Sequence, residues 1–217
     1  TNIDYLYLTS FVLILTPLVV FKYYDFIFKN FNISFETFSL RNIVIPLGIS
    51  YYTFQALSYI IDVRLGKIKA ERSIVRYSLY MSFFPKLLMG PIERYDDFSK
   101  QLKITDNINP AKFSLGIKFI IVGLFKKLVI ADRISIFSSA VFSSYEHHSG
   151  MTLIFTMVLY AFQLYCDFSG YIDIAKGVSL LFGIKLTENF RNPFFATSIT
   201  DFWRRWNISL SSWLADY

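Results

Sequence analysis

MTLIFTMVLYAFQLYCDFSGYIDIAKGVSLLFGI (Met151–Ile184) is the segment that most clearly indicates the fold class of this chain. It is apolar from Met151 to Tyr165, and after the pair Ser169-Gly170 it continues as an apolar run to Ile184. A helix needs about 20 mostly apolar residues to cross the hydrocarbon of a bilayer. The stretch therefore predicts helices solvated by lipid, with a break in the helix at Ser169-Gly170.

The composition of the whole chain agrees with a membrane protein. Of the 217 residues, 54% are hydrophobic and 19% are aromatic, and the mean hydropathy is +0.42. A soluble domain distributes its apolar residues periodically, whereas here they are gathered into long runs. The net charge of +6 could indicate nucleic acid, but no basic stripe alternates with stacking aromatics outside the runs. We assign the charge to loops beside anionic lipid.

Further apolar runs extend this pattern along the chain. They are Tyr5–Phe28, Ile43–Ile61, Tyr77–Ile92 and Phe113–Ile130. Tyr77–Ile92 is short and contains two prolines and a glycine, which suits a broken or re-entrant helix that lines a cavity. We predict an all-α, polytopic transmembrane protein with roughly four or five spanning helices plus this broken element. Residues 1–217 would form a single transmembrane domain.

The distribution of Lys and Arg among the loops predicts the orientation of the chain in the membrane. Residues 62–76 form the most basic short loop, so we place them in the cytoplasm, and we place the Ser-rich loop 131–150 outside. Lys126 and Lys127, near the predicted outer end of their run, are the exception to this bias.

The two ends of the sequence and its single cysteine allow two further predictions. The chain starts at Thr1 and enters an apolar run without the pattern of a signal peptide, and it stops at Tyr217 inside a patterned segment. We expect it to be incomplete at both ends. Cys166 stands alone, so it has no partner for an intrachain disulfide, and its expected role is that of a small buried hydrophobe.

Thr200–Tyr217 is the most informative stretch for function. Aromatic and apolar residues recur in it at helical spacing, and polar residues form a second stripe beside them. The apolar stripe is Trp203, Trp206, Leu210, Trp213 and Tyr217, and the polar stripe is Thr200, Arg204, Asn207 and Ser211. Such a helix could lie at the membrane interface with its rings at the headgroups. Alternatively, its polar stripe faces a buried cavity, because polar groups at membrane depth are costly and tend to be functional.

Two other charged side chains fall inside apolar stretches. Asp167 could simply cap a helix that begins after it, or it could line a reaction chamber. Lys86, between two prolines, could extend to the membrane interface or line the same chamber. His147 and His148 lie in a polar loop, where neighbouring histidines are usually solvated, and we expect no metal site.

Five segments in order resemble the membrane-bound O-acyltransferase family, and most of all its bacterial branch of alginate O-acetylases, followed by the D-alanine exporters that esterify teichoic acid. They are IPLGISYYTFQALSYIIDV (Ile45–Val63), SFFPKLLMGPIERYDDF (Ser82–Phe98), GLFKKLVIADRI (Gly123–Ile134), YCDFSGYIDIAKGVSLLFGIKLTENFRNPF (Tyr165–Phe194) and DFWRRWNISLSSWLADY (Asp201–Tyr217). The first 40 or so residues match only as a generic span.

The resemblance implies a helical fold around a tunnel through a bacterial inner or plasma membrane. An acyl donor, acetyl-CoA or an acyl carrier protein, would enter from the cytoplasm, and a polysaccharide hydroxyl would enter from the other face. It implies partner proteins, no metal, no tightly held cofactor and no nucleic acid. Asn207 stands at the family's catalytic His or Asn position, where it would orient groups or stabilise an oxyanion. The residues we expect to line the chamber are Asp167, Arg204, Arg205, Trp203, Ser211 and Lys86.

Two departures from the family pattern keep an alternative open. Bacterial members usually carry His at the position of Asn207, and none of the motifs quoted above supplies the second His, the general base on the acceptor hydroxyl. We therefore expect residues 1–217 by themselves to be inactive. The alternative to an enzyme is a non-catalytic degenerate relative or a transporter-like membrane protein.

Overall fold

A computed structural model describes residues 2–30, 46, 48–102 and 110–217. Within these residues the chain is helical, and the one extended pairing is an isolated antiparallel bridge between Phe190 and Trp206. The all-α prediction is confirmed. The chain divides into two compact units, one holding the described residues up to Leu88 with Ile92–Ser99 and Tyr217, the other holding Met89–Pro91 and Lys100–Asp216. That the whole forms a single transmembrane domain stays a prediction.

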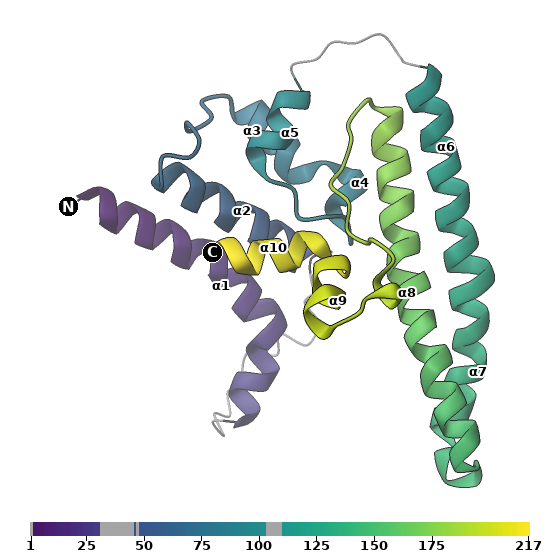
Figure 1. The fold of residues 1–217 in the computed structure, drawn as a ribbon. Helices are drawn as coiled ribbons and strands as arrows, with labels where there is room; N and C mark the ends of the chain where they lie inside the picture. Colours follow the sequence, from purple (N-terminus) through teal and green to yellow (C-terminus); the bar gives the residue numbers. More distant parts are fainter. Residues whose placement is uncertain (1, 31–45, 47, 103–109) are drawn as a thin grey trace. The chain divides into compact units, whose positions relative to one another are not determined.

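The first unit is built on two helices, α1 (Asn2–Asn30) and α2 (Ile49–Arg64), which pack against each other (Figure 1). An ion pair between Asp4 and Arg64 joins the start of α1 to the end of α2. Gly48 precedes α2 with a φ of 74°, and a Cβ there would meet the carbonyl oxygen of Leu87 at 1.9 Å. Only glycine combines this left-handed conformation with so close an approach of another backbone.

The segment Tyr77–Ile92 is broken, as predicted. Helix α3 (Ile74–Ser82) stops before Phe83, whose ψ of 100° lies outside the helical region. Helix α4 (Phe84–Leu87) begins directly after Phe83. Pro85 lies in the first turn of α4, where its missing N–H costs no hydrogen bond. Helix α5 (Tyr95–Gln101) follows. Whether the broken segment re-enters the membrane stays a prediction.

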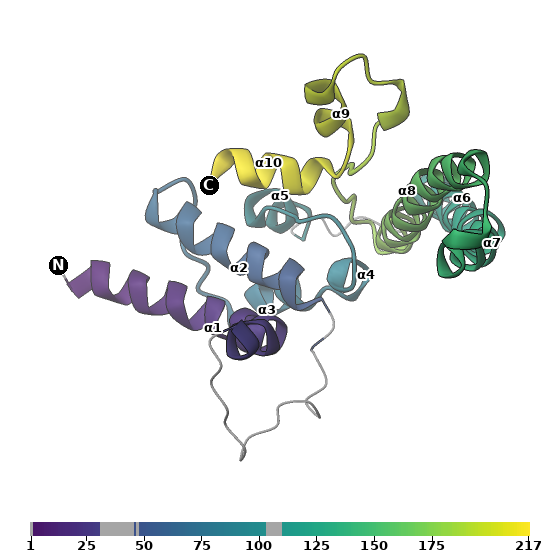
Figure 2. The ribbon, with the colours of Figure 1, turned by 90° about the horizontal axis from the view of Figure 1, so that it is seen from below.

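The second unit contains a long helical hairpin (Figures 1 and 2). Its first arm runs without interruption through α6 (Pro110–Leu124), a π-helix η2 (Phe125–Ala131) and α7 (Asp132–Ser143). After the short turn η3 (Tyr145–His147), α8 (Gly150–Leu181) returns along the whole arm. The chain then passes through η4 (Pro193–Phe195) to α9 (Ile199–Arg205) and α10 (Ile208–Asp216).

The predicted helix break at Ser169-Gly170 is wrong, because α8 continues through both residues. Gly170 serves a close approach between the two arms of the hairpin. A Cβ on Gly170 would meet the carbonyl oxygen of Gly123 at 2.9 Å, and a Cβ on Gly177 would meet that of Gly116 at 2.5 Å. Small residues at such crossings let helix backbones touch, which is a common way of packing helices in membranes. Asp167 therefore caps no new helix.

The prediction of one continuous helix over Thr200–Tyr217 is also wrong. The helix breaks at Trp206 and Asn207, and Asn207 takes a left-handed conformation with φ 43°. The two stripes of side chains expected from helical spacing thus end at the break. Periodicity alone could not reveal it, because Asn is among the residues that enter the left-handed region without glycine.

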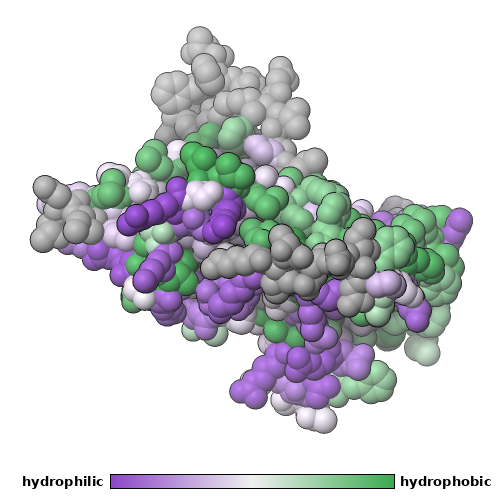
Figure 3. All heavy atoms as spheres, turned by 90° about the horizontal axis from the view of Figure 1, so that it is seen from above, coloured by the Kyte–Doolittle hydropathy of each residue, from purple (hydrophilic) through white to green (hydrophobic). Residues whose placement is uncertain are grey.

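Two helices among the described residues are long and apolar enough to cross a membrane, namely α1 over Asp4–Tyr23 and α8 over Gly150–Leu181. Large apolar side chains in the first half of α8 are well exposed, including Met151 and Val158, as lipid contact would require. In Figure 3 the hydrophobic colour prevails over the helical hairpin at the right of the view. The number of spans stays a prediction, and residues 31–45, where the polar link ends and the second apolar run begins, lie outside the described residues.

Candidate functional site

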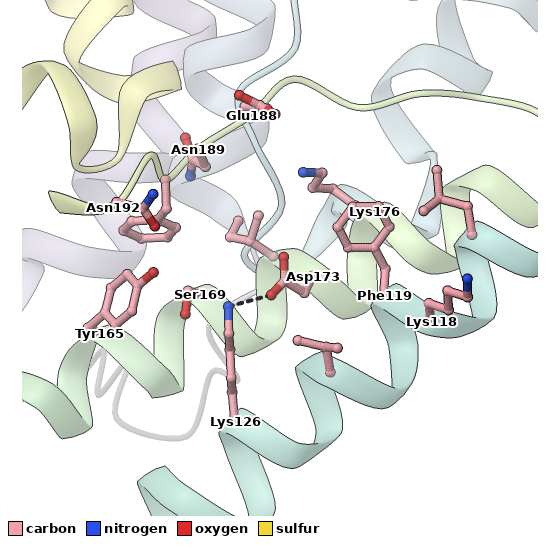
Figure 4. A pocket seen from close by; sticks show the side chains of 14 residues that line it. Lys118, Phe119, Lys126, Tyr165, Ser169, Asp173, Lys176, Glu188, Asn189 and Asn192 are labelled. Carbon is pink, nitrogen blue, oxygen red and sulfur yellow. Dashed lines mark hydrogen bonds and ion pairs between the residues drawn. The ribbon is translucent and has the colours of Figure 1, made fainter. Parts of the chain in front are cut away.

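A cavity of about 380 Å³ lies within the second unit, between the α6–η2 arm, α8 and the segment that follows α8 (Figure 4). Polar, charged and apolar side chains all line it. Its lining comprises Leu115, Lys118, Phe119, Val122, Lys126, Tyr165, Ser169, Ile172, Asp173, Lys176, Glu188, Asn189, Phe190 and Asn192. Eight of these fourteen residues are polar or charged, so the cavity offers more polar groups than the mostly apolar pocket of a typical ligand site.

An ion pair crosses the middle of the cavity. Lys126 Nζ lies 2.6 Å from Asp173 Oδ2, and the two side chains are only 24% and 15% exposed. The Lys126 ammonium also lies 5.8 Å from the ring centroid of Tyr165. Since a half-buried charge needs compensation, the pair stabilises two charged groups inside an otherwise apolar helical hairpin.

Gly170 sets the position of this pair and of a second one. A Cβ on Gly170 would lie 3.3 Å from both Lys126 Cβ and Lys127 N, so η2 passes directly over it. Lys126 reaches Asp173 on one side of α8, and Lys127 reaches Asp167 at 2.6 Å on the other. Lys127 also pairs with Asp132 at 2.9 Å. The two consecutive lysines thus straddle α8 at the glycine.

Asp167 lies away from the cavity. At 100° per residue it faces roughly the opposite side of α8 from Ser169, Asp173 and Lys176, which line the cavity. The carboxylate on the α8 wall of this cavity is that of Asp173. A role for Asp167 in the chamber of the whole protein stays a prediction.

Asn207, the predicted catalytic residue, is tied to the cavity by Asn189. The side chain of Asn189 is 1% exposed, and its Nδ2 donates to Asn207 Oδ1 at 3.0 Å. Asn189 Oδ1 accepts from the backbone N–H of Ser209 at 2.9 Å, and its carbonyl accepts from the N–H of Ile208. One cavity-lining asparagine therefore fixes both the Asn207 side chain and the start of α10.

The backbone of Asn207 also starts α10. Its carbonyl oxygen accepts from the N–H groups of Leu210 and Ser211, each at 3.0 Å, while the Ser211 hydroxyl donates to the carbonyl of Trp206 at 3.3 Å. Because Asn189 occupies the amide oxygen of Asn207, the amide NH₂ remains as the donor for a ligand. This arrangement suits a group that donates to a developing negative charge.

Aromatic rings hold the chain just before Asn207. The Trp206 ring stacks on Phe202 with centroids 5.5 Å apart, and it meets Phe190 at 5.1 Å and Tyr165 at 6.0 Å. Phe190 and Trp206 also form the isolated backbone bridge. These contacts connect α8, the segment after it and α9, so Asn207 is positioned by packing as well as by hydrogen bonds.

The other predicted residues of the Trp-Arg-Arg-Trp segment lie around α9. Arg205 Nε donates to Asp201 Oδ1 at 2.9 Å, and this hydrogen bond holds the pKa of Asp201 below its usual value. Arg204 is exposed, and Trp203 is 54% exposed with its ring against Phe202. The structure therefore brings Asn207 and Ser211 together, while Arg204 and Trp203 point outward from the described residues.

Lys86 lies in the first unit and is fully buried. Its ammonium lies 4.0 Å from the ring centroid of Tyr80 and 4.5 Å from that of Phe98, two side chains with 0% exposure. The Tyr80 hydroxyl donates to the carbonyl of Glu93 at 2.8 Å. The expected extension of Lys86 to the interface is not seen, because its amine is enclosed by rings. Its place in the chamber stays a prediction.

Several residues that line the cavity were not among the predicted site residues. Lys126, Asp173 and Lys176 carried a signal, since each is a charge inside an apolar run. Ser169 was noted only as part of a supposed helix break. Asn189 carried no signal, because an asparagine in a polar connecting segment is ordinary until its partners are known.

Comparison with known proteins shows the family of this chain. The profile of the membrane-bound O-acyltransferase family matches residues 67–217. The probable alginate O-acetylase AlgI of Pseudomonas syringae is 39% identical over 91% of this chain, and the peptidoglycan O-acetyltransferase of Helicobacter pylori is 37% identical over 91%. The teichoic acid D-alanyltransferase of Bacillus subtilis is 36% identical over 82%.

The matches cover only part of each relative. This chain spans 39%, 42% and 45% of the lengths of these three proteins. The family profile nevertheless covers most of the chain, and it includes both the cavity and the Trp-Arg-Arg-Trp segment. The chain therefore belongs to the membrane-bound O-acyltransferase family and is part of a membrane protein.

Proposed function

We propose that the protein is an O-acyltransferase, which transfers an acyl group, acetyl in the simplest case, from a cytoplasmic donor to a hydroxyl of an envelope or extracellular polysaccharide. The observation that supports this proposal is the hydrogen bond to Asn207, which stands at the family's His or Asn position, from Asn189, which lines the cavity. The relatives' names add that alginate, peptidoglycan and teichoic acid are acceptors or targets of similar proteins.

In this proposal Asn207 stabilises the transition state. When a hydroxyl attacks the carbonyl of a thioester, negative charge develops on the carbonyl oxygen, and a prepositioned N–H donor lowers the barrier. The amide NH₂ of Asn207 is such a donor, because Asn189 engages its oxygen. The acceptor hydroxyl must lose a proton as it attacks, and the family pattern assigns this step to a histidine outside the motifs of this sequence.

The family resemblance also supports a proposal about the membrane location and the partners of the protein. We propose a multi-pass protein of a bacterial inner or plasma membrane, with partner proteins of a polysaccharide acetylation system and without a resident metal or cofactor. Polar groups of the cavity lie on both arms of the hairpin and on the segment after α8, and α8 is long and apolar enough to cross a membrane.

Three substitutions at Asn207 test the proposal in the full-length protein. Asn, Asp and His all tolerate the left-handed backbone that φ 43° requires, so Asn207→Asp and Asn207→His preserve the turn. Asn207→His keeps an N–H donor and should retain turnover within about 10-fold, whereas Asn207→Asp and Asn207→Ala lose the donor and should fall by about 10²–10³-fold. The measurement is the transfer of labelled acetyl to envelope glycan in membranes carrying each variant. Full turnover by Asn207→Asp would remove the oxyanion role.

A further inference from the structure

The segment that joins α2 to α3 carries more positive charge than its acidic residues balance. Between Asp62 and Glu93 the only carboxylate is that of Glu71, whereas five cationic side chains fall within residues 64–76. All five are exposed, and they are Arg64, Lys67, Lys69, Arg72 and Arg76. The segment and the two helices that it joins belong to the first unit.

Two of these cations already have carboxylate partners. Arg64 pairs with Asp4 of α1, and Lys67 Nζ lies 3.7 Å from Asp62 Oδ1. In the part of the chain that the structure describes, the other three cations form no ion pair with a carboxylate. These three are Lys69, Arg72 and Arg76.

The carboxylate of Glu71 is turned toward the protein. Tyr95 donates to Glu71 Oε2 at 2.6 Å, and the N–H of Ser73 donates to Glu71 Oε1 at 2.8 Å. The N–H of Glu71 in turn donates to the hydroxyl oxygen of Tyr59 at 2.8 Å. Arg76 attracts this carboxylate only at longer range, without an ion pair. Glu71 thus fixes the segment to the first unit and leaves the three cations to an external anion.

Exposed apolar side chains follow these cations directly. Ile74 and Val75, in the first turn of α3, are 79% and 72% exposed. Tyr80, on another side of the helix, is 0% exposed and packs against Tyr95 with ring centroids 5.1 Å apart. Helix α3 therefore turns one side inward and presents apolar side chains outward beside the cations. Basic residues next to exposed apolar ones are typical of a surface at the boundary between lipid headgroups and acyl chains.

We propose that residues 69–76 bind the headgroup of an anionic phospholipid. Lys69, Arg72 and Arg76 contact the phosphate, while Ile74 and Val75 lie among the uppermost methylenes of the acyl chains. A bilayer fits this surface better than an acidic protein, because the chain is part of a membrane protein and lipid supplies both the negative charge and the apolar cover. The inference does not depend on the proposed acyl transfer.

Bound lipid would also hold the broken segment that follows. Glu71 is hydrogen-bonded to Tyr95, whose ring packs against Tyr80. The ring of Tyr80 in turn lies 4.0 Å from the ammonium of Lys86 in α4. The segment is therefore connected by direct contacts to the core of the first unit. Since a ligand that binds only the folded state stabilises it, anionic lipid should make the protein more stable.

The test uses the full-length protein in lipid nanodiscs, freed of other cysteines and labelled with a fluorophore at Ser78→Cys. Ser78 is exposed and lies about one turn after Ile74 on α3. Brominated phosphatidylglycerol and brominated phosphatidylcholine, at equal mole fraction, are compared as quenchers. We expect phosphatidylglycerol to occupy the site about 5–20-fold in preference at low salt, with the preference falling at high salt because the charges are screened.

Two double variants separate a site from the diffuse attraction of a basic loop. Arg72→Gln with Arg76→Gln should abolish the preference, and Arg72→Lys with Arg76→Lys should retain most of it. Arg64→Gln with Lys67→Gln removes the same charge from the same loop, but at positions that already have carboxylate partners. This control should keep the preference within about 2-fold. Equal losses in the two Gln variants would show diffuse attraction only and would overturn the site.

Thermal unfolding in the same nanodiscs gives a second measurement. Phosphatidylglycerol should raise the unfolding midpoint of wild type by about 2–6 °C and leave that of Arg72→Gln with Arg76→Gln unchanged. In phosphatidylcholine alone the two proteins should unfold at the same temperature, because the removed charges are exposed. The proposal is wrong if wild type shows no preferential quenching by phosphatidylglycerol. If poly-glutamate at matched ionic strength displaces phosphatidylglycerol from the probe, the surface fits an acidic protein and the lipid assignment is overturned.

Discussion

At the scale of single residues, two asparagines organise the site. Asn207 takes the left-handed turn between α9 and α10. The side chain of Asn189 donates to Asn207 and accepts from the N–H of Ser209, and its backbone carbonyl accepts from the N–H of Ile208. Family members with His at the position of Asn207 fit the same account, because His also enters the left-handed region and can donate an N–H. The left-handed backbone conformation and the need for an N–H donor can thus be met by the same side chain, either Asn or His.

Asn189 is expected to act through Asn207 and not on the substrate itself. Asn189→Ala removes the donor that orients Asn207, so kcat should fall by about 10–100-fold while KM for the donor changes little. In an Asn207→Ala background, the same substitution should have almost no further effect on kcat, since the group it orients is gone. The measurement is a double-mutant cycle on the acetyl-transfer rate.

A purely structural role for Asn189 would give another result. The lost hydrogen bond to Ser209 N would lower stability by about 1–3 kcal/mol in both backgrounds, and the two losses of activity would multiply. Multiplying losses would therefore assign Asn189 to the folding of α10 alone.

At the scale of elements, the helical hairpin depends on glycines that face each other. Where α8 crosses the first arm, Gly170 meets Gly123, and η2 passes close enough to place Lys126 and Lys127 on opposite sides of α8. A π-helix at this point is consistent with a functional site, where such irregular turns are frequent. The ion pair in the cavity is thus a consequence of helix packing.

Substitution at this crossing should damage the hairpin. A Cβ on Gly170 would meet backbone atoms of Gly123 and Lys127, which cannot rotate away, so the helices must separate. Gly170→Ala should destabilise the protein by about 1–3 kcal/mol and weaken the Lys126–Asp173 pair, with loss of acetyl transfer. Gly150→Ala is the control on the same helix, because a Cβ there meets nothing within 4 Å. Equal thermal midpoints for the two variants in detergent would contradict this account.

At the scale of the whole molecule, the hairpin groups segments that we predict to share a side of the membrane. Because α8 returns along the first arm, the start of α6 and the end of α8 lie at one end of the hairpin and η3 lies at the other. Lys112 and Lys185 flank the hairpin at the end opposite η3, which agrees with the placement of that end in the cytoplasm.

Thiol labelling tests this topology. In a full-length protein freed of other cysteines, we introduce Glu146→Cys in η3 or Lys69→Cys in the basic loop, both at exposed positions. A membrane-impermeant thiol reagent should label the first in intact cells and the second only after permeabilisation. Labelling of both from the same side would refute the assigned orientation.

The helical class, the broken segment before Ile92 and the family motifs could be predicted from the sequence, because they depend on local apolar runs and on residues close together in the chain. The continuity of α8 at Gly170 could not be predicted, since a glycine can break a helix or let another helix approach, and the packing of the neighbouring helix determines which of the two occurs. The pairing of Asn207 with Asn189 could not be predicted from the sequence either. Their hydrogen bond joins residues 18 positions apart, and no helical period relates positions on either side of a turn in the left-handed region.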